Sequence, residues 1–245
     1  MRKAFTSLLL AGAFILLSNQ TSFAQDRSPA DHGVWDGLLK EYVDADGWVD
    51  YKGFMEKRLV LHQYLTYLSE NKPEATASQN VILAFYINLY NAAMVDRVLE
   101  HYPIGSVKDI KRVWGKKLIP LGEELLSLND IEHGILRKLD EPRIHFAVNC
   151  ASVSCPKLMN SAFVADRLEE QLDTATKAFL NSDKNQLDGT EIGLSKLFSW
   201  YKKDFVVAGV ADPLAYINQY LQEPLDVKTK TYFLEYDWNL NEQGQ

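Results

Sequence analysis

An almost unbroken apolar stretch near the middle of the chain constrains the fold more than any other feature. Residues 81–89 have the sequence VILAFYINL and are apolar on every face of the helix that this composition predicts. Ser78 is a suitable N-cap for the helix, and Pro103 ends it. A helix without a polar face belongs in a core, and the 47% of hydrophobic residues against 24% charged ones are enough to surround it.

Two amides interrupt this apolar helix. Asn88 and Asn91 are three residues apart and therefore lie on one face. A buried amide without a hydrogen bond costs about 1–3 kcal/mol, so both side chains must meet polar partners. Backbone from an adjoining loop is the commoner kind of partner. A catalytic group or a bound ligand is the alternative, and it would make both asparagines site residues.

The rest of the chain mixes helices with a few strands. Apolar residues recur at helical spacing in several segments, namely residues 35–42, 59–68, 128–139, 165–180 and 197–201. Alternating side chains predict the clearest strand at residues 143–149 and a weaker one at residues 229–236. Helices and strands do not alternate regularly, which favours an α+β fold: a single domain with several helices packed on a small, mainly antiparallel sheet.

The first residues have the pattern of an export signal. Arg2 and Lys3 precede an apolar run, and small residues flank a cleavage site after Ala24. We therefore expect a signal peptide at residues 1–24, a single globular domain at residues 25–245 and a periplasmic or extracellular location. The run is too short for a stable membrane span, and none is expected after the signal is removed. The net charge of -7 argues against binding to nucleic acid.

A short acidic segment allows two interpretations. Asp44, Asp46 and Asp50 surround Gly47, and an Asp-Gly step typically supplies a turn residue that tolerates positive φ. A calcium loop is the alternative, but the EF-hand pattern requires another acidic residue before its glycine and a glutamate farther on. The sequence therefore favours the turn.

Most strong catalytic motifs are absent from the sequence. It has no G-x-x-x-x-G-K-[ST], G-x-G-x-x-G, H-E-x-x-H, G-x-S-x-G or C-x-x-C motif. One segment remains of interest, because residues 143–156 contain one histidine and both cysteines of the chain, Cys150 and Cys155. In an exported protein two cysteines are first interpreted as a disulfide, and a turn over five residues can bring the α-carbons within the required 4.4–6.8 Å.

A nucleophilic cysteine is the rival interpretation, and it needs a nearby base. On a straight strand His145 and Cys150 would lie about 16 Å apart on opposite faces. Cys155 follows the turn and can return toward His145, which makes it the better nucleophile by geometry. His133 lies off the apolar stripe of its helix and is an alternative base. Zinc bound by His145, Cys150 and Cys155 is a weaker possibility, because no second paired motif is present.

Several separate blocks of the sequence resemble the domain-of-unknown-function 547 family. They occur in one order between about Trp35 and Asn241, and they are residues 85–92 (FYINLYNA), 131–133 (IEH), 143–156 (RIHFAVNCASVSCP) and 236–241 (YDWNLN). The resemblance supports a single domain but implies no established activity. It implies that recurring family positions are matched by Asn88, Asn91, His133, His145, Cys150 and Cys155. The cysteine pair also occurs in cytosolic members, which weakens a purely disulfide role.

These observations support one leading functional hypothesis and two alternatives. The first is an exported thiol-dependent hydrolase or acyl-transfer enzyme with a Cys/His/Asn site, needing no cofactor or metal ion. Its ligand would be a small molecule, a peptide or a component of the cell envelope. The alternatives are a non-catalytic binding module with a Cys150–Cys155 disulfide and a small zinc site.

Overall fold

The fold is described for residues 30–244 of a computed structural model. The predicted signal peptide, residues 1–24, lies outside this range. The α-helices of the described residues are α1 (Gly33–Tyr42), α2 (Tyr51–Glu56), α3 (Arg58–Glu70), α4 (Gln79–His101), α5 (Leu128–Gly134), α6 (Ile144–Ala147), α7 (Leu168–Leu180), α8 (Leu197–Trp200) and α9 (Pro213–Asn218). The strands are β1 (Ile119–Leu121), β2 (Glu124–Leu126), β3 (Ile192–Leu194), β4 (Val206–Val207), β5 (Val210–Ala211) and β6 (Thr231–Phe233).

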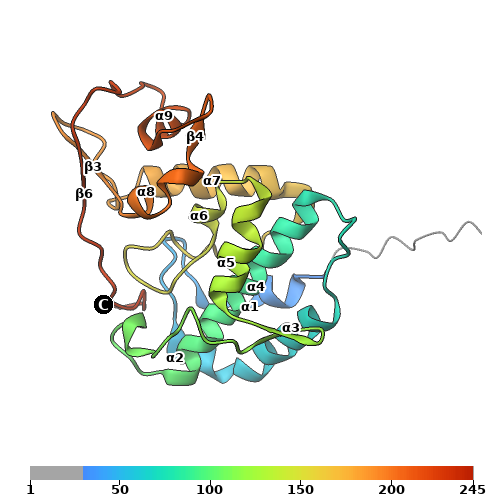
Figure 1. The fold of residues 1–245 in the computed structure, drawn as a ribbon. Helices are drawn as coiled ribbons and strands as arrows, with labels where there is room; N and C mark the ends of the chain where they lie inside the picture. Colours follow the sequence, from blue (N-terminus) through green and yellow to red (C-terminus); the bar gives the residue numbers. More distant parts are fainter. Residues whose placement is uncertain (1–29, 245) are drawn as a thin grey trace, which may run out of the picture.

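Helices dominate the architecture, and the predicted α+β single domain is confirmed. The described strands form three separate two-stranded pairs instead of one sheet. The pairs β1–β2 and β4–β5 are antiparallel, whereas β3–β6 is parallel. Figure 1 shows α1 to α5 in a larger body and α8, α9 and the last four strands in a smaller part, with α7 between them.

Helix α4 is the centre of the larger hydrophobic core, as its apolar sequence predicts. Ser78 caps its first turn by accepting a hydrogen bond from the backbone N–H of Val81. By length and hydropathy α4 is the one helix among the described residues that could span a membrane. Its most apolar window is 83% buried inside the protein, so the helix packs as a core element.

A second hydrophobic cluster lies under the smaller part of the molecule. Phe146, Phe179, Phe198 and Phe205 pack against one another with ring centroids 4.9 to 6.3 Å apart. Phe146 belongs to α6 and Phe179 to α7, whereas Phe198 belongs to α8. The cluster therefore fixes the smaller part against α6 and α7, which border the larger body.

The strand predicted at residues 143–149 is wrong. Residues Ile144–Ala147 form the short helix α6, with a backbone hydrogen bond of 3.0 Å from Val148 N to Ile144 O. The alternation of residue types predicted a strand with one polar face. His145 is as buried as its apolar neighbours, so the segment has no polar face and the two-residue period does not report its structure. Pro142 directly precedes the helix. Proline has no backbone N–H, and at this end of a helix such a group would have no partner within the helix.

Local turns and caps fix the ends of several elements. Ser127 and Asp130 form a capping box at the start of α5. The β1–β2 hairpin turns at Gly122, which has φ +60°. Gly47 has φ +86° in the predicted turn, and a β-carbon there would come within 2.9 Å of the Lys157 backbone.

The C-terminal segment crosses from the smaller part back to the larger body. Figure 1 shows it running from β6 along one side of the molecule to the C-terminus. Backbone hydrogen bonds of 2.9 to 3.0 Å attach it to three distant segments, through Val153, Gly105 and Val49. Residues 236–241 are therefore next to the loop that carries the cysteines.

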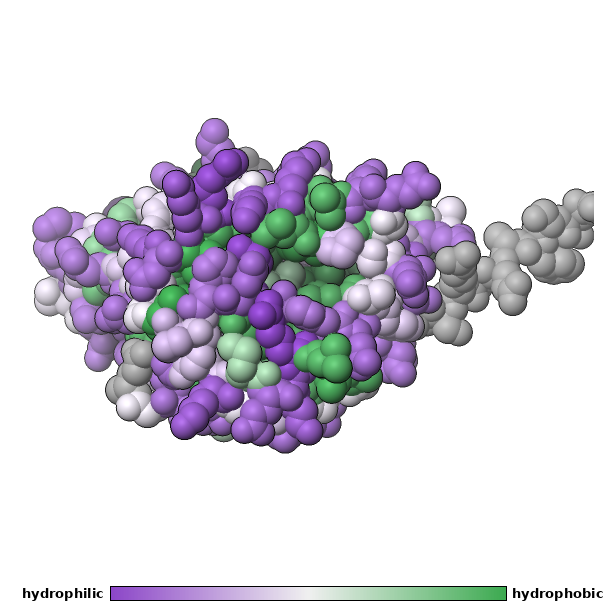
Figure 2. Space-filling view, turned by 90° about the horizontal axis from the view of Figure 1, so that it is seen from below, coloured by the Kyte–Doolittle hydropathy of each residue, from purple (hydrophilic) through white to green (hydrophobic). Residues whose placement is uncertain are grey.

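The surface is mostly hydrophilic with scattered apolar side chains. Figure 2 shows one face on which small hydrophobic groups lie between hydrophilic ones, with a hollow near the centre. The most exposed large hydrophobic side chains include Leu59 in α3, Leu125 in β2 and Val210 in β5. Single exposed residues of this kind are normal for a folded protein.

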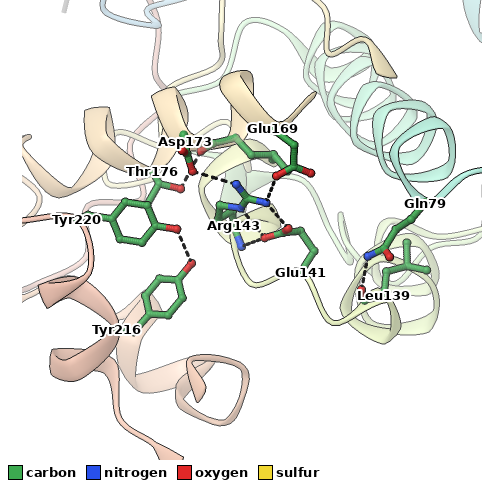
Figure 3. Close-up of polar contacts among 10 residues, drawn as sticks. Gln79, Leu139, Glu141, Arg143, Glu169, Asp173, Thr176, Tyr216 and Tyr220 are labelled. Carbon is green, nitrogen blue, oxygen red and sulfur yellow. Dashed lines mark hydrogen bonds and ion pairs between the residues drawn. The ribbon is translucent and has the colours of Figure 1, made fainter. Parts of the chain in front are cut away.

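An arginine just before α6 ties this helix to α7. Arg143 is in contact with the carboxylates of Glu141, Glu169 and Asp173, the last at 2.9 Å (Figure 3). Its side chain is only 14% exposed, and these carboxylates keep the pKa of the guanidinium above its ordinary value. The network holds the segment that leads into the cysteine loop against α7.

We expect Arg143→Met to lower the free energy of unfolding by about 1–3 kcal/mol, because the hydrogen bonds to three carboxylates are lost. Urea denaturation measures the change. Lys177→Met in the same helix α7 is the matched control, since Lys177 is exposed and its side chain makes no contact of this kind, and it should change stability by less than about 0.5 kcal/mol. Equal effects of the two substitutions would contradict the role of the network.

Candidate functional site

The loop of residues 149–156 is held in place by α4. Asn91 accepts a hydrogen bond of 2.8 Å from the backbone N–H of Asn149 and donates one of 3.0 Å to Ala147 O. The Asn149 side chain donates to Pro156 O at 2.8 Å, which closes the loop on itself. Buried hydrogen bonds at both ends therefore give the loop one shape.

The second amide of α4 is also bound to backbone. Asn88 accepts from Phe163 N at 3.0 Å and donates to Phe163 O at 2.7 Å. Both amides thus have the backbone partners that the sequence favoured. Neither Asn88 nor Asn91 lines the cavity described below, so their contribution to a site is to position backbone.

A sharp turn follows the first cysteine. Ala151 has φ +61°, a left-handed conformation that costs an L-residue roughly 1–2 kcal/mol. Its N–H is bonded to the Asn149 side-chain oxygen at 2.8 Å, and its carbonyl accepts from Asn241 N at 3.3 Å. Strained backbone of this kind persists where neighbouring bonds enforce it, and it is concentrated at functional sites.

A cavity of about 400 Å³ opens beside this loop. Four of the six residues chosen from the sequence line it: Cys150, Cys155, His133 and His145. The rest of its wall is mostly aromatic or apolar, and it consists of Tyr90, Trp114, Asn129, Glu132, Val148, Pro156, Leu197, Trp200, Tyr201, Tyr236 and Trp238. An apolar pocket with a few convergent polar groups is the usual form of a small-molecule site.

Both cysteines are free thiols in the structure, and they differ in environment. Burial alone would raise the pKa of Cys150. The hydrogen bonds that it receives from Cys155, Ser152 and Tyr236 outweigh this and lower the pKa below its ordinary value. The Cys150 sulfur is 3.0 Å from Ser152 Oγ and 3.4 Å from the Tyr236 hydroxyl. Cys150 is therefore the thiol that ionises first.

Cys155 has the opposite tendency. It is 5% exposed, and its burial together with the neighbouring Cys150 raises its pKa well above the ordinary value. Its sulfur accepts the backbone N–H of Cys150 at 2.8 Å. Sequence geometry pointed to Cys155 as the nucleophile, whereas exposure and charge in the structure favour Cys150.

The buried imidazole of His145 contacts a partly buried pair of charged side chains. Its Nε2 lies 2.7 Å from Asp204 Oδ2, and Arg137 makes a bidentate contact with the same carboxylate at 2.6 and 2.7 Å. Burial alone would raise the pKa of Asp204, but these two partners lower it well below its ordinary range. With Nε2–H donating to the carboxylate, Nδ1 carries a lone pair, and this buried atom has no hydrogen-bond partner among residues 30–244. Such an imidazole is oriented to accept a proton at Nδ1.

His133 occupies a more open position. It is exposed, and its Nδ1 lies 3.2 Å from the Arg137 guanidinium, which can only donate. Within residues 30–244 no hydrogen bond joins either thiol to either of these imidazoles. The same range contains no group of three His, Cys, Asp or Glu side chains that could hold a metal ion, which leaves the predicted zinc site without support.

Several residues in and around this cavity were not among the predicted site residues. Asp204 follows no motif, and nothing in the sequence relates it to His145. Glu132 and Tyr236 do lie in blocks that carried the family resemblance, beside His133 and Trp238 respectively. That position in a matching block was the one available signal for them.

Comparison with known proteins agrees with the resemblance. The model of the family described as "Protein of unknown function, DUF547" matches residues 74–180. Residues 74–180, less than half of the chain, are therefore similar to the DUF547 family. The match includes α4 and the cysteine loop, but Asp204, Tyr236 and Trp238 lie beyond it. No curated protein and no solved structure matches the chain.

We expect a thiol reagent to label Cys150 first in the reduced protein. The labelling rate should rise with pH through a midpoint below about 8.5, the ordinary value for a thiol, because three donors stabilise the thiolate. Peptide mapping after timed addition of iodoacetamide at several pH values measures this.

Tyr236→Phe removes one of these donors and should move the midpoint of Cys150 labelling upward. Tyr232→Phe is the matched control, since the Tyr232 hydroxyl bonds Gln186 and not a cysteine. Faster labelling of Cys155 than of Cys150 would contradict the assignment.

Proposed function

We propose that this protein is an exported thiol-dependent hydrolase or acyl-transfer enzyme with Cys150 as its nucleophile. One observation carries the proposal: a thiol with a lowered pKa shares a cavity with an imidazole that an ionised carboxylate orients. Thiolate nucleophile, base and orienting group are the three parts of nucleophilic acyl transfer.

Each step uses groups that line this cavity or contact its wall. The Cys150 thiolate attacks the carbonyl carbon of an ester, thioester or amide, so that a sulfur–carbon bond forms and the bond to the leaving group breaks. His145 takes the thiol proton at Nδ1 as Cys150 ionises and gives this proton to the leaving group. It then takes a proton from the water or other acceptor that attacks the thioester, and the Cys150 thiolate departs as the product is released. Asp204 stabilises the imidazolium, and Arg137 keeps Asp204 ionised.

Export and ligand class are part of the same proposal. The N-terminal pattern at residues 1–24 supports export to the periplasm or the cell exterior. The size of the cavity, about 400 Å³, suits a small molecule, one or two residues of a peptide or a group on a cell-envelope component. Asn88 and Asn91 serve by holding the backbone of the site.

The contact between the two cysteines favours a second candidate. A hydrogen bond of 2.8 Å from the Cys150 backbone N–H to Cys155 Sγ holds the Cys155 sulfur next to the Cys150 backbone. A Cys150–Cys155 disulfide would fix the loop and remove the nucleophile, giving a non-catalytic binding module. Intact mass under non-reducing conditions separates the candidates, because a fully oxidised pair contradicts thiol catalysis.

We expect p-nitrophenyl acetate to acetylate Cys150 in a burst that releases about one nitrophenol per protein. Cys150→Ser should abolish the burst, and His145→Gln should slow it by roughly 10²–10⁴-fold, the usual contribution of a general base. Absorbance of nitrophenol and peptide mapping of the acetyl group measure these outcomes.

Cys155→Ser is the matched control, because it removes the other thiol of the same loop but keeps a hydroxyl that can donate to Cys150, so the burst should persist. Asp204→Asn should retain the Cys150 acetylation site but slow its formation, since the imidazole loses its orienting charge. An acetyl group on Cys155 or on a lysine, with none on Cys150, would overturn the proposed function.

A further inference from the structure

Glu132 is a buried carboxyl group at the wall of the cavity. It is 5% exposed and accepts hydrogen bonds from the Tyr90 hydroxyl, at 3.3 Å, and from the Tyr201 hydroxyl. Within the described part of the chain, residues 30–244, this carboxylate makes no ion pair. Two neutral hydroxyl groups compensate the burial of a carboxylate less fully than a paired cation does.

The nearby cations of the protein already have other partners. Arg137 is held by both oxygens of Asp204, and its guanidinium carbon lies 5.2 Å from the Tyr201 ring centroid. His133 uses Nδ1 to accept from the same guanidinium. Arg137 is close enough to be attracted to Glu132, but its donors are directed to Asp204 and His133. Glu132 therefore keeps room to pair with a positive group that enters the cavity.

The opening side of the same cavity presents aromatic rings. Trp200 is 47% exposed, and its ring lies 4.8 Å from Tyr236 and 5.7 Å from Trp238 between centroids. The Lys108 ammonium group lies 4.3 Å from the Trp238 ring centroid, so this wall already holds one cation on a ring face. Aromatic faces attract ammonium groups through the ring quadrupole.

We propose that Glu132 and this aromatic wall bind a primary ammonium group of the substrate. The chemical class is an alkylammonium ion, whose charge lies near Glu132 and whose methylene groups pack between the rings. This inference rests on the proposed function, because the ammonium group would hold an amine-bearing substrate beside Cys150. It adds a charge requirement that thiol chemistry alone does not impose.

The test compares two probes of one length and different charge. n-Hexylammonium and 1-hexanol are titrated into the Cys150→Ser protein while the fluorescence of the cavity tryptophans is recorded. We expect n-hexylammonium to bind about tenfold more tightly than 1-hexanol. Equal affinities, or tighter binding of the alcohol, would overturn the inference.

Glu132→Gln should remove the preference for the ammonium probe while 1-hexanol still binds. Glu123→Gln is the matched control, since Glu123 is an exposed acid outside the cavity and its loss should leave the preference unchanged. Trp200→Leu, at a half-exposed position, keeps an apolar side chain but removes a ring face and should reduce the preference severalfold. If Glu132→Gln does not fold, the Trp200→Leu variant tests the ammonium site in its place. A preference that persists in both cavity variants contradicts the assignment.

The two proposals fail separately. Binding is measured on Cys150→Ser protein, in which the nucleophile is absent, so its outcome is independent of acyl transfer. Acetylation by p-nitrophenyl acetate involves no ammonium group, so a normal burst with no probe preference would overturn the ammonium site alone.

Discussion

Hydrogen bonds from two buried amides of α4 to loop backbone determine how this protein is assembled. Asn91 binds the chain on both sides of Val148, and Asn88 binds both polar backbone groups of Phe163. Each bond replaces water that the core excludes, and loss of one partner leaves a buried polar group unpaired at a cost of about 1–3 kcal/mol. The central helix thereby specifies the position of the cysteine loop.

The cavity combines this rigid support with parts brought from far along the chain. The cysteine loop and His133 belong to the segment that the DUF547 family shares, whereas Asp204 and Tyr236 come from the C-terminal part. Tyr236 lowers the pKa of Cys150 by donating a hydrogen bond, and Asp204 orients His145. The family segment alone therefore carries the thiols and the imidazoles, but the C-terminal part supplies groups that set their protonation.

Charge in and around the cavity follows one pattern. Arg137 and Asp204 pair with each other and fix His145, whereas Glu132 is a buried acid that forms no ion pair within residues 30–244. An ionised Cys150 adds a second negative charge to the same space. A positively charged substrate group would relieve both, which links the proposed thiol chemistry to the proposed preference for an ammonium ion.

The sequence by itself determined the core helix with its Ser78 cap, the α+β class and the segment that holds the thiols. These features follow from local patterns: continuous apolarity, helical spacing and cap residues that act within one or two turns. The tertiary structure decided that residues 143–149 contain a helix. This segment is buried on all sides, so it has no polar face from which the secondary structure could be recognised in the sequence. It also decided that Asp204 meets His145 and that Cys150 is more readily ionised than Cys155. Those outcomes depend on contacts between residues up to 86 positions apart, and no local pattern encodes such contacts.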